Sequence, residues 1–571
     1  MPAALSSPAS PSPKARFRRG LIVAAGAALT LIASLALAPL AHADTAPPAG
    51  TPETVTADNL PTWQTNGIVW SLTQSGGTVY AGGNFDHIRP PGTADGDPSQ
   101  LTRSNLAAFN VATGQPTGFD HAVTGTAYSS TTNPGPECDS VGTNEWLCQA
   151  IFRVKAAPDG SALYFGGDFT HVDGEPRSRL AGVSLSTGQL DPAMTPDING
   201  RVRGIAVSAT TVYIGGDFTQ VDGQTRTRLA ALDRATGALL PWAPAADDTV
   251  RTLALSSDGS RVIVGGDFPH LNGSNENAIG AVDASTGALT TWNSRPIQSP
   301  NGSQFSGVTE LVVVGPTVFG GAHGEGGGVF DGRFAVDTNT GTTQWKDTCL
   351  GATTTIAVQG GIVYSGSHAH DCSSMGGWSQ TNPATYQRLL AETADSGGAS
   401  KNKLLHWFPS VNTGPADSYY KQGPWAMAND DTYLWVAGEF TKVGGVDQQG
   451  LTRFAPKSVA PDINPPEAPF AAPVATNASK TSLKVSWDAT WDRDNTATTY
   501  QLFRDDGTTP IYTTTVNTNF WTLPTLSFTD TGLVTGSSHY YRVKVADPFN
   551  NKRSSPYGDA VTVKCPWFIC L

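Results

Sequence analysis

Five residues that could bind a metal ion or transfer protons lie at two related places in a repeated part of the chain. A Gly-Gly-Asp-Phe sequence recurs, and two degenerate copies carry histidine at the position of the phenylalanine. Imidazole and carboxylate groups bind divalent metals and serve as general acids and bases. The pattern predicts either a divalent-metal or acid–base site, or a polar surface region formed by two altered repeats. The residues are His323, Glu325, His368, His370 and Asp371.

Tryptophan and arginine recur at the start of the strand that precedes each Gly-Gly-Asp-Phe copy. Tryptophan offers a flat apolar face with a polar edge, and arginine binds carboxylates through two parallel hydrogen bonds. At the mouth of a central channel such residues would bind a saccharide, including an acidic one, although they could instead pack between neighbouring repeats. The candidate ligand-binding residues are Trp70, Arg153, Arg203, Arg251 and Trp425, aligned with Thr309 and Thr354.

Several aspartates also recur from one repeat to the next. A catalytic residue needs a unique environment, whereas Asp side chains in repeated turns commonly bind nearby backbone N–H groups. We therefore interpret these aspartates as turn-formers, so that they cannot supply the two carboxylates of a glycoside hydrolase and the catalytic residues stay unassigned. The recurring residues are Asp168, Asp173, Asp217, Asp222 and Asp267.

The repeat itself specifies the elements that must hold these side chains. One unit contains the runs Val202–Val207, Thr211–Phe218, Arg228–Asp233 and Ala238–Trp242, and the next unit repeats all four. Each run is short, rich in β-branched or aromatic residues and bounded by turn residues. Four strands in a unit of about 50 residues are typical of a β-propeller blade.

Seven copies of the glycine-containing strand can be counted along the chain. Their first residues are Gly82, Gly166, Gly215, Gly265, Gly320, Ser365 and Ala437. An additional Leu60–Trp63 segment precedes the first complete set and matches Leu239–Trp242. A strand from the N-terminus that completes the last blade would remove the open sheet edges. We therefore predict an all-β fold with a seven-bladed β-propeller over residues 58–456, closed by an N-terminal strand.

The overall composition agrees with many short strands and tight turns. The 571 residues include 62 Gly and 40 Pro, and 15% are charged, whereas about a quarter is usual. This profile excludes a long-helix or coiled-coil protein. Because 39% of the residues are hydrophobic, a disordered chain is excluded as well.

The first 43 residues have the features of a secretory signal. Four basic residues between Lys14 and Arg19 precede the uncharged run Gly20–Leu40, and Ala41–Ala43 is a small-x-small cleavage site. The run could also be an uncleaved membrane anchor. We expect cleavage after Ala43, by the Sec or Tat route, and a secreted, extracellular or cell-surface protein that is not in the membrane. Loss of the four basic residues changes the net charge from −12 to about −16, which argues against nucleic-acid partners.

Six cysteines in an exported chain indicate disulfides. Disulfides between nearest neighbours along the chain would close three loops. The sequence has no CxxC motif, so it gives little support for a zinc ribbon. The predicted pairs are Cys138 with Cys148, Cys349 with Cys372, and Cys565 with Cys570.

The repeat resembles a known family. The pattern GGDFxxVxGxxRxxLAALDxxTGALxxW, found most fully between Gly215 and Trp242, is similar to the delta-sixty-type propeller repeats of secreted bacterial proteins. This resemblance implies the fold and export, and implies little about activity. The Asp-x-x-Thr-Gly turn also resembles the repeat of quinoprotein dehydrogenases, which carry adjacent cysteines beside their cofactor. No Cys-Cys pair occurs in this chain.

The C-terminal part resembles a fibronectin type III β-sandwich. The resemblance lies in the alternating runs Ser482–Trp487, Thr499–Arg504 and Tyr540–Val545. The predicted organisation is a signal at 1–43, a linker at 44–57 and the propeller at 58–456. A Pro-rich linker at 457–473, the sandwich at 474–563 and a Cys-containing tail at 564–571 follow.

Two classes of function remain. The first is a secreted, non-enzymatic binding or scaffold protein that recognises an extracellular glycan or a protein partner. The second is an extracellular hydrolase of glycosidic bonds, because type III domains accompany secreted polysaccharide-degrading enzymes. No cofactor is expected apart from a divalent metal, and the oligomeric state is not specified. Two non-repeated carboxylates at the channel mouth would favour the hydrolase.

Overall fold

The computed structural model describes residues 45–47, 51–293, 295–325, 330–347, 349–395 and 402–565, without the side chain of residue 325. The predicted signal and Cys570 lie outside these residues. The described part is all-β apart from one short 3-10 turn, Ser373–Met375. It contains no helix with the length and apolar character needed to cross a membrane.

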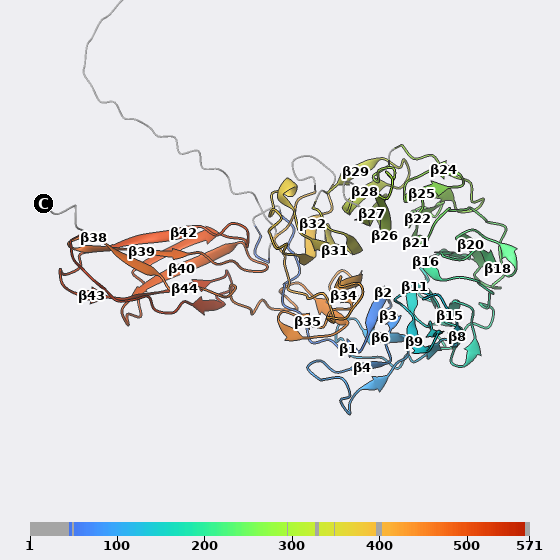
Figure 1. Cartoon of the computed structure of the whole chain (residues 1–571), viewed down its shortest axis with the longest axis horizontal. Helices are drawn as coiled ribbons and strands as arrows, with labels where there is room; N and C mark the ends of the chain where they lie inside the picture. Colours follow the sequence, from blue (N-terminus) through green and yellow to red (C-terminus); the bar gives the residue numbers. More distant parts are fainter. Residues whose placement is uncertain are drawn as a thin grey trace, which may run out of the picture. The chain divides into compact units, whose positions relative to one another are not determined.

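Within the described residues, seven antiparallel sheets form a closed ring (Figure 1). Their first strands contact one another in chain order, and the last of them contacts the first. These strands are β2 (Ile68–Ser75), β11 (Ile151–Ala156), β16 (Val202–Val207), β21 (Val250–Leu255), β26 (Phe305–Val314), β30 (Thr353–Gln359) and β33 (Pro424–Asn429).

Each first strand pairs with a second strand that carries the Gly-Gly motif or its degenerate copy. The second strands are β3 (Thr78–Asn84), β12 (Ala162–Gly167), β17 (Thr211–Gly216), β22 (Arg261–Gly266), β27 (Thr317–Glu325), β31 (Ile362–Ala369) and β34 (Leu434–Gly438). The third strands are β6 (Leu106–Asn110), β15 (Leu180–Ser184), β20 (Leu229–Asp233), β25 (Ile279–Asp283), β28 (Gly332–Asp337), β32 (Gln387–Thr393) and β37 (Leu451–Phe454).

The two glycines of the motif are required by two different close contacts, one with the next sheet and one with the first strand of the same sheet. A Cβ on Gly166 would lie 2.4 Å from Val202 Cγ1 of the next sheet, and one on Gly167 would lie 2.0 Å from the Ala150 carbonyl oxygen. Neither distance is compatible with a side chain. The first glycine therefore marks the place where one sheet packs on the next, and the second marks a close backbone approach within its own sheet.

A regular fourth strand forms in one sheet of the described ring, as β29 (Thr343–Lys346). In the other six sheets of the described ring it is reduced to a single bridge on the third strand: Phe109 with Pro116, Val183 with Leu190, Leu232 with Leu239, Val282 with Leu289, Glu392 with Leu404 and, in the last sheet, Arg453 with Leu60 of the N-terminal segment. The expected four-stranded unit is thus largely a three-stranded sheet with one additional bridge.

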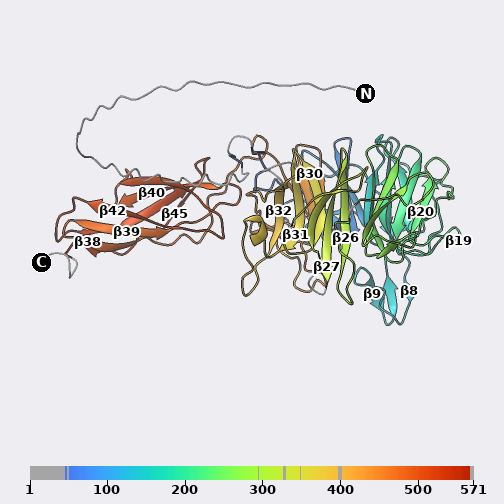
Figure 2. The same ribbon diagram turned by 90° about the horizontal axis from the view of Figure 1, so that it is seen from above.

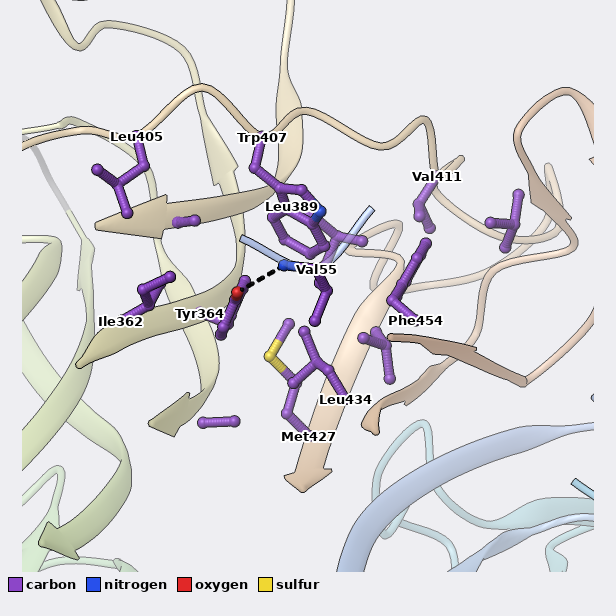
Figure 3. Close-up of a cluster of buried hydrophobic side chains, with 14 of the residues drawn as sticks. Val55, Ile362, Tyr364, Leu389, Leu405, Trp407, Val411, Met427, Leu434 and Phe454 are labelled. Atoms are coloured by element: carbon purple, nitrogen blue, oxygen red, sulfur yellow. Dashed lines mark hydrogen bonds between the residues drawn. The ribbon is translucent and has the colours of Figure 1, made fainter. Parts of the chain in front are cut away.

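The N-terminal segment lies against the last sheet. The Leu60 N–H donates to the Arg453 carbonyl of β37 at 2.9 Å. Val55 packs among Tyr364, Trp407 and Phe454, and its N–H donates to the Tyr364 hydroxyl at 3.0 Å (Figure 3). Residues from both ends of the ring therefore share one hydrophobic core.

An insertion between the first two sheets forms a small three-stranded sheet that projects from the ring (Figure 2). Its strands are β8 (Tyr128–Ser129), β9 (Asp139–Gly142) and β10 (Glu145–Leu147). The Cys138–Cys148 disulfide closes its base, and Cys349–Cys372 forms as well. These two predicted pairings are confirmed.

The C-terminal part is a two-sheet sandwich. One sheet contains β38 (Val474–Ser479), β39 (Ser482–Asp488) and β42 (Thr525–Thr531); the other contains β41 (Tyr512–Asn517), β40 (Ala497–Arg504), β44 (Tyr541–Ala546) and β45 (Lys552–Ser554). Trp487, Tyr500 and Tyr541 fill the core between them. The Pro-rich stretch before it is held in place, since Ala460, Asp462 and Phe470 are buried.

Candidate functional site

A small cavity of about 120 Å³ lies where the first strands of the ring begin. All five predicted ligand-binding residues line it: Trp70, Arg153, Arg203, Arg251 and Trp425. Phe152, Tyr420, Glu137 and Glu310 line it as well. We call this cavity the channel mouth.

The strand register places one of the five differently from the sequence alignment. In four sheets the residue before a β-bulge pairs with the second glycine of the motif: Val69 with Gly83, Ile151 with Gly167, Val202 with Gly216 and Val250 with Gly266. The next residues are Trp70, Phe152, Arg203 and Arg251. Phe152 therefore occupies the position expected for Arg153, which lies one residue further into the channel.

One side of the channel mouth is aromatic. The ring centroids of Trp70 lie 4.9 Å from Trp425 and 5.1 Å from Tyr420, and all three rings meet edge to face. Trp425 Nε1 donates to Glu439 at 3.2 Å, whereas Trp70 Nε1 is buried and has no hydrogen-bond partner among the described residues. Burial and the neighbouring Glu137 carboxylate raise the pKa of Tyr420, so its hydroxyl remains a donor.

The other side is a set of arginine–carboxylate pairs. Arg203 Nε lies 2.8 Å from Asp217, Arg251 Nη2 lies 2.7 Å from Asp267, and Arg153 Nη1 lies 2.7 Å from Glu310. Arg203 also approaches Glu137 at 3.7 Å. Because every arginine already has a carboxylate partner, the channel mouth carries no excess positive charge.

These pairs change the interpretation of the recurring aspartates. Asp217 and Asp267, together with Asp168 beside Arg201, bind arginine side chains rather than turns. Burial would raise the pKa of Asp267, but a hydrogen bond from His323 and the charge of Arg251 outweigh it and hold the pKa below its usual range. Asp173 and Asp222 do accept backbone N–H groups, from Ala122 and Asp197, both at 2.8 Å.

The structure does not bring the predicted metal residues into one group. His323 Nε2 lies 3.1 Å from Asp267, and His368 Nδ1 lies 2.6 Å from the Gln422 amide oxygen. The Asp371 carboxylate accepts the N–H groups of Ser373 and Gln380. The ring centroids of His368 and His370 are 6.4 Å apart, and burial lowers the pKa of His368. The Glu325 side chain lies outside the described residues.

The described part of the chain contains two other groups of side chains that could bind a metal. Within each group, the possible ligand atoms lie within 4.8 Å of one another. One contains Cys138 and Cys148, which are consumed in a disulfide, with Asp168. The other contains the buried carboxylates of Asp462, Asp492 and Asp494, the oxygen ligands that calcium accepts. Burial and repulsion from neighbouring carboxylates raise the pKa of Asp462 to about 7. Burial raises the pKa of Asp492 to about 6, and burial and the same repulsion also raise the pKa of Asp494.

Two acidic residues of the channel mouth were not predicted. Glu310 lies in the bulge of β26, where the other first strands carry Ser, Arg, Gly, Thr or Ala, so its departure from the repeat was a detectable signal. Glu137 comes from the insertion next to the Cys138 disulfide, and nothing in the repeat indicates where it lies.

A ring of repeated antiparallel sheets around a lined channel mouth defines a β-propeller repeat protein. Residues 195–322, which span the third sheet, the fourth and part of the fifth, match the family model described as outer membrane protein assembly factor BamB. No curated protein matches the chain. The repeat therefore supports a binding or scaffold role.

Proposed function

We propose that this chain is a secreted extracellular binding protein whose channel mouth takes a carbohydrate group. In this proposal the ring is a seven-bladed propeller of delta-sixty-type repeats closed by its N-terminal strand, and the sandwich is a fibronectin type III domain. The leader at 1–43 supports export, and the two disulfides are compatible with an oxidising compartment.

The observation that carries the proposal is the aromatic group of Trp70, Tyr420 and Trp425 beside paired charges. Aromatic faces pack on the C–H faces of sugars, while the arginines and carboxylates supply donors and acceptors for hydroxyl groups. Because the arginines are already neutralised, a neutral sugar fits better than the acidic one that the arginines alone suggest. A cavity below the usual range for drug-sized ligands suits one terminal sugar ring.

A glycan array of the mature protein tests this proposal. We expect the wild-type protein to bind glycans that have a neutral terminal sugar. The Trp70→Ala/Trp425→Ala variant should bind them at least about tenfold more weakly, because the stacking surface is lost. Tyr557→Ala, an exposed aromatic of the sandwich, is the matched control and should bind as the wild type does. Unchanged melting temperatures would show that the variants fold. If the wild type retains no glycan, or if the double variant retains them equally, the channel mouth is not a sugar site.

The alternative, a glycoside hydrolase, has one observation in its favour. Glu137 and Glu310 are two non-repeated carboxylates that both line the channel mouth. Both lie beside arginines, at 3.5 Å (Arg201 Nη1) and 2.7 Å (Arg153 Nη1), rather than in the apolar setting that keeps a general acid protonated.

An assay for new reducing ends on the retained glycans separates the two functions. A hydrolase would generate new reducing ends, and the Glu310→Gln variant would generate none while it still binds the glycans. We expect no release by the wild type, which would leave binding as the function.

A further inference from the structure

Beneath the channel mouth the ring encloses a second cavity of about 280 Å³. Each of the seven first strands contributes at least one apolar side chain to its wall, from Leu72 of β2 to Met427 of β33. Its charged lining residues are Arg153, Lys155 and Glu310. We call this cavity the channel chamber.

Arg153 and Glu310 separate the channel chamber from the channel mouth, since both residues line both cavities. Arg153 Nη1 pairs with Glu310 at 2.7 Å, its Nε donates to the Arg203 carbonyl at 3.2 Å, and its Nη2 donates to the Arg251 carbonyl at 3.3 Å. The side chain therefore spans three first strands. Its charge and that of Glu310 cancel.

Lys155 is the remaining charge. No hydrogen bond or ion pair joins its ammonium to another group among the described residues, and its side chain is exposed into the hollow of the channel. The corresponding residues of the other six described first strands are uncharged, so Lys155 is the one charged residue at this level of the ring: they are Thr73, Ala206, Ala254, Val312, Ala357 and Ala428. The walls of the channel surround this exposed ammonium and partly desolvate it, which lowers the pKa of Lys155, and the charge of Glu310 opposes this only in part.

We infer that the channel chamber binds a short aliphatic monocarboxylate, with its carboxylate on Lys155 and its alkyl chain against the apolar wall. Inside the channel the walls displace part of the water around this unpaired ammonium, so an anion that pairs with it there gains more than it would in bulk water. A second charge on the ligand would lack a partner, and a wholly neutral ligand would leave the ammonium unpaired. Carbohydrate binding at the channel mouth is not required for this site, although the two cavities share Arg153 and Glu310.

Titration calorimetry of the full mature protein with acetate, butyrate, hexanoate and hexanol tests the inference. We expect one saturable site, with affinity rising about threefold to fourfold for each buried methylene. Hexanol should bind at least about tenfold more weakly than hexanoate because it cannot pair with the ammonium. Equal binding of hexanol and hexanoate, or no saturable binding of any carboxylate, would overturn the inference.

Lys155→Met removes the charge and keeps the length of the side chain. We expect it to weaken hexanoate binding at least about tenfold, whereas Lys442→Met, at an exposed lysine, should have no effect. As an independent readout in the wild-type protein, hexanoate should slow modification of Lys155 by a small amine reagent, followed by peptide mass spectrometry. Binding that survives Lys155→Met with no protection of Lys155 would contradict the assignment.

Discussion

Replacing Arg333 with methionine is expected to destabilise the ring by about 3–5 kcal/mol. The Arg333 side chain of β28 is completely buried with the carboxylates of Asp347 and Glu392, and it pairs with both. Its Nη2 lies 2.7 Å from Glu392 Oε1, which joins the fifth sheet to the sixth. Removing the guanidinium leaves two buried carboxylates without a cation. Uncompensated buried charge lowers the free energy of unfolding much more than replacement of the whole ion pair would.

Urea denaturation followed by tryptophan fluorescence measures this effect, and a rescue variant checks its cause. Adding Asp347→Asn and Glu392→Gln to Arg333→Met should recover most of the loss, because no unpaired charge is then buried. Lys442→Met, at an exposed pair with Asp447, should change stability by less than about 1 kcal/mol. Equal destabilisation of the single and triple variants would show that lost packing, not charge, is responsible.

The second large effect concerns the carboxylates of Asp462, Asp492 and Asp494. Their pKa values are raised in the folded chain, so the folded state holds more protons than the unfolded state between about pH 4 and pH 7. Their contribution to stability is therefore greatest at acid pH and is lost as pH rises through the folded values. We expect a loss of about 3 kcal/mol from pH 5 to pH 8, since one pKa unit is worth about 1.4 kcal/mol and coupled groups share their protons.

Asp494→Asn isolates this contribution. The neutral Asn amide can donate a hydrogen bond at any pH, whereas the Asp carboxyl can do so only when it is protonated. The variant should therefore be more stable than the wild type at pH 8, and its stability should depend less on pH. Thermal unfolding from pH 5 to pH 8 measures both, in buffer with a chelator because carboxylates also bind divalent cations. Asp559→Asn, at an exposed site, is the matched control. An identical pH profile for wild type and Asp494→Asn would contradict the proposed charge repulsion.

Most repeated features of the structure were accessible from the sequence, whereas most unrepeated ones were not, apart from the two disulfides between cysteines close in the chain. The glycine motif marks the second strands because a Cβ on its first glycine would clash with the next sheet and one on its second glycine would clash with the neighbouring strand of the same sheet. Trp70, Arg203, Arg251 and Trp425 were found because repeats place equivalent residues at equivalent places on the ring. Arg153 was displaced by one because Phe152 precedes it directly, and only the bulge register separates the two.

The polar partners depend on contacts between sheets that no local pattern encodes. His323 was expected to join His368, but it faces Asp267 of the preceding sheet. The recurrence of Asp267 alone predicts a turn-former, but it recurs together with the arginine that it pairs with in the structure. Glu137 reaches the channel mouth from an insertion that has no counterpart in the repeat.

The contact between the N-terminal segment and the last sheet has a consequence for synthesis and quality control. Arg453 Nη2 donates to the Pro61 carbonyl across 392 positions of sequence, so the ring cannot close until nearly all of it has been translated and exported. Before then, both outer edges expose unpaired backbone groups that can pair with another chain. Truncated products that end before β37 should therefore aggregate or be degraded rather than accumulate as smaller rings.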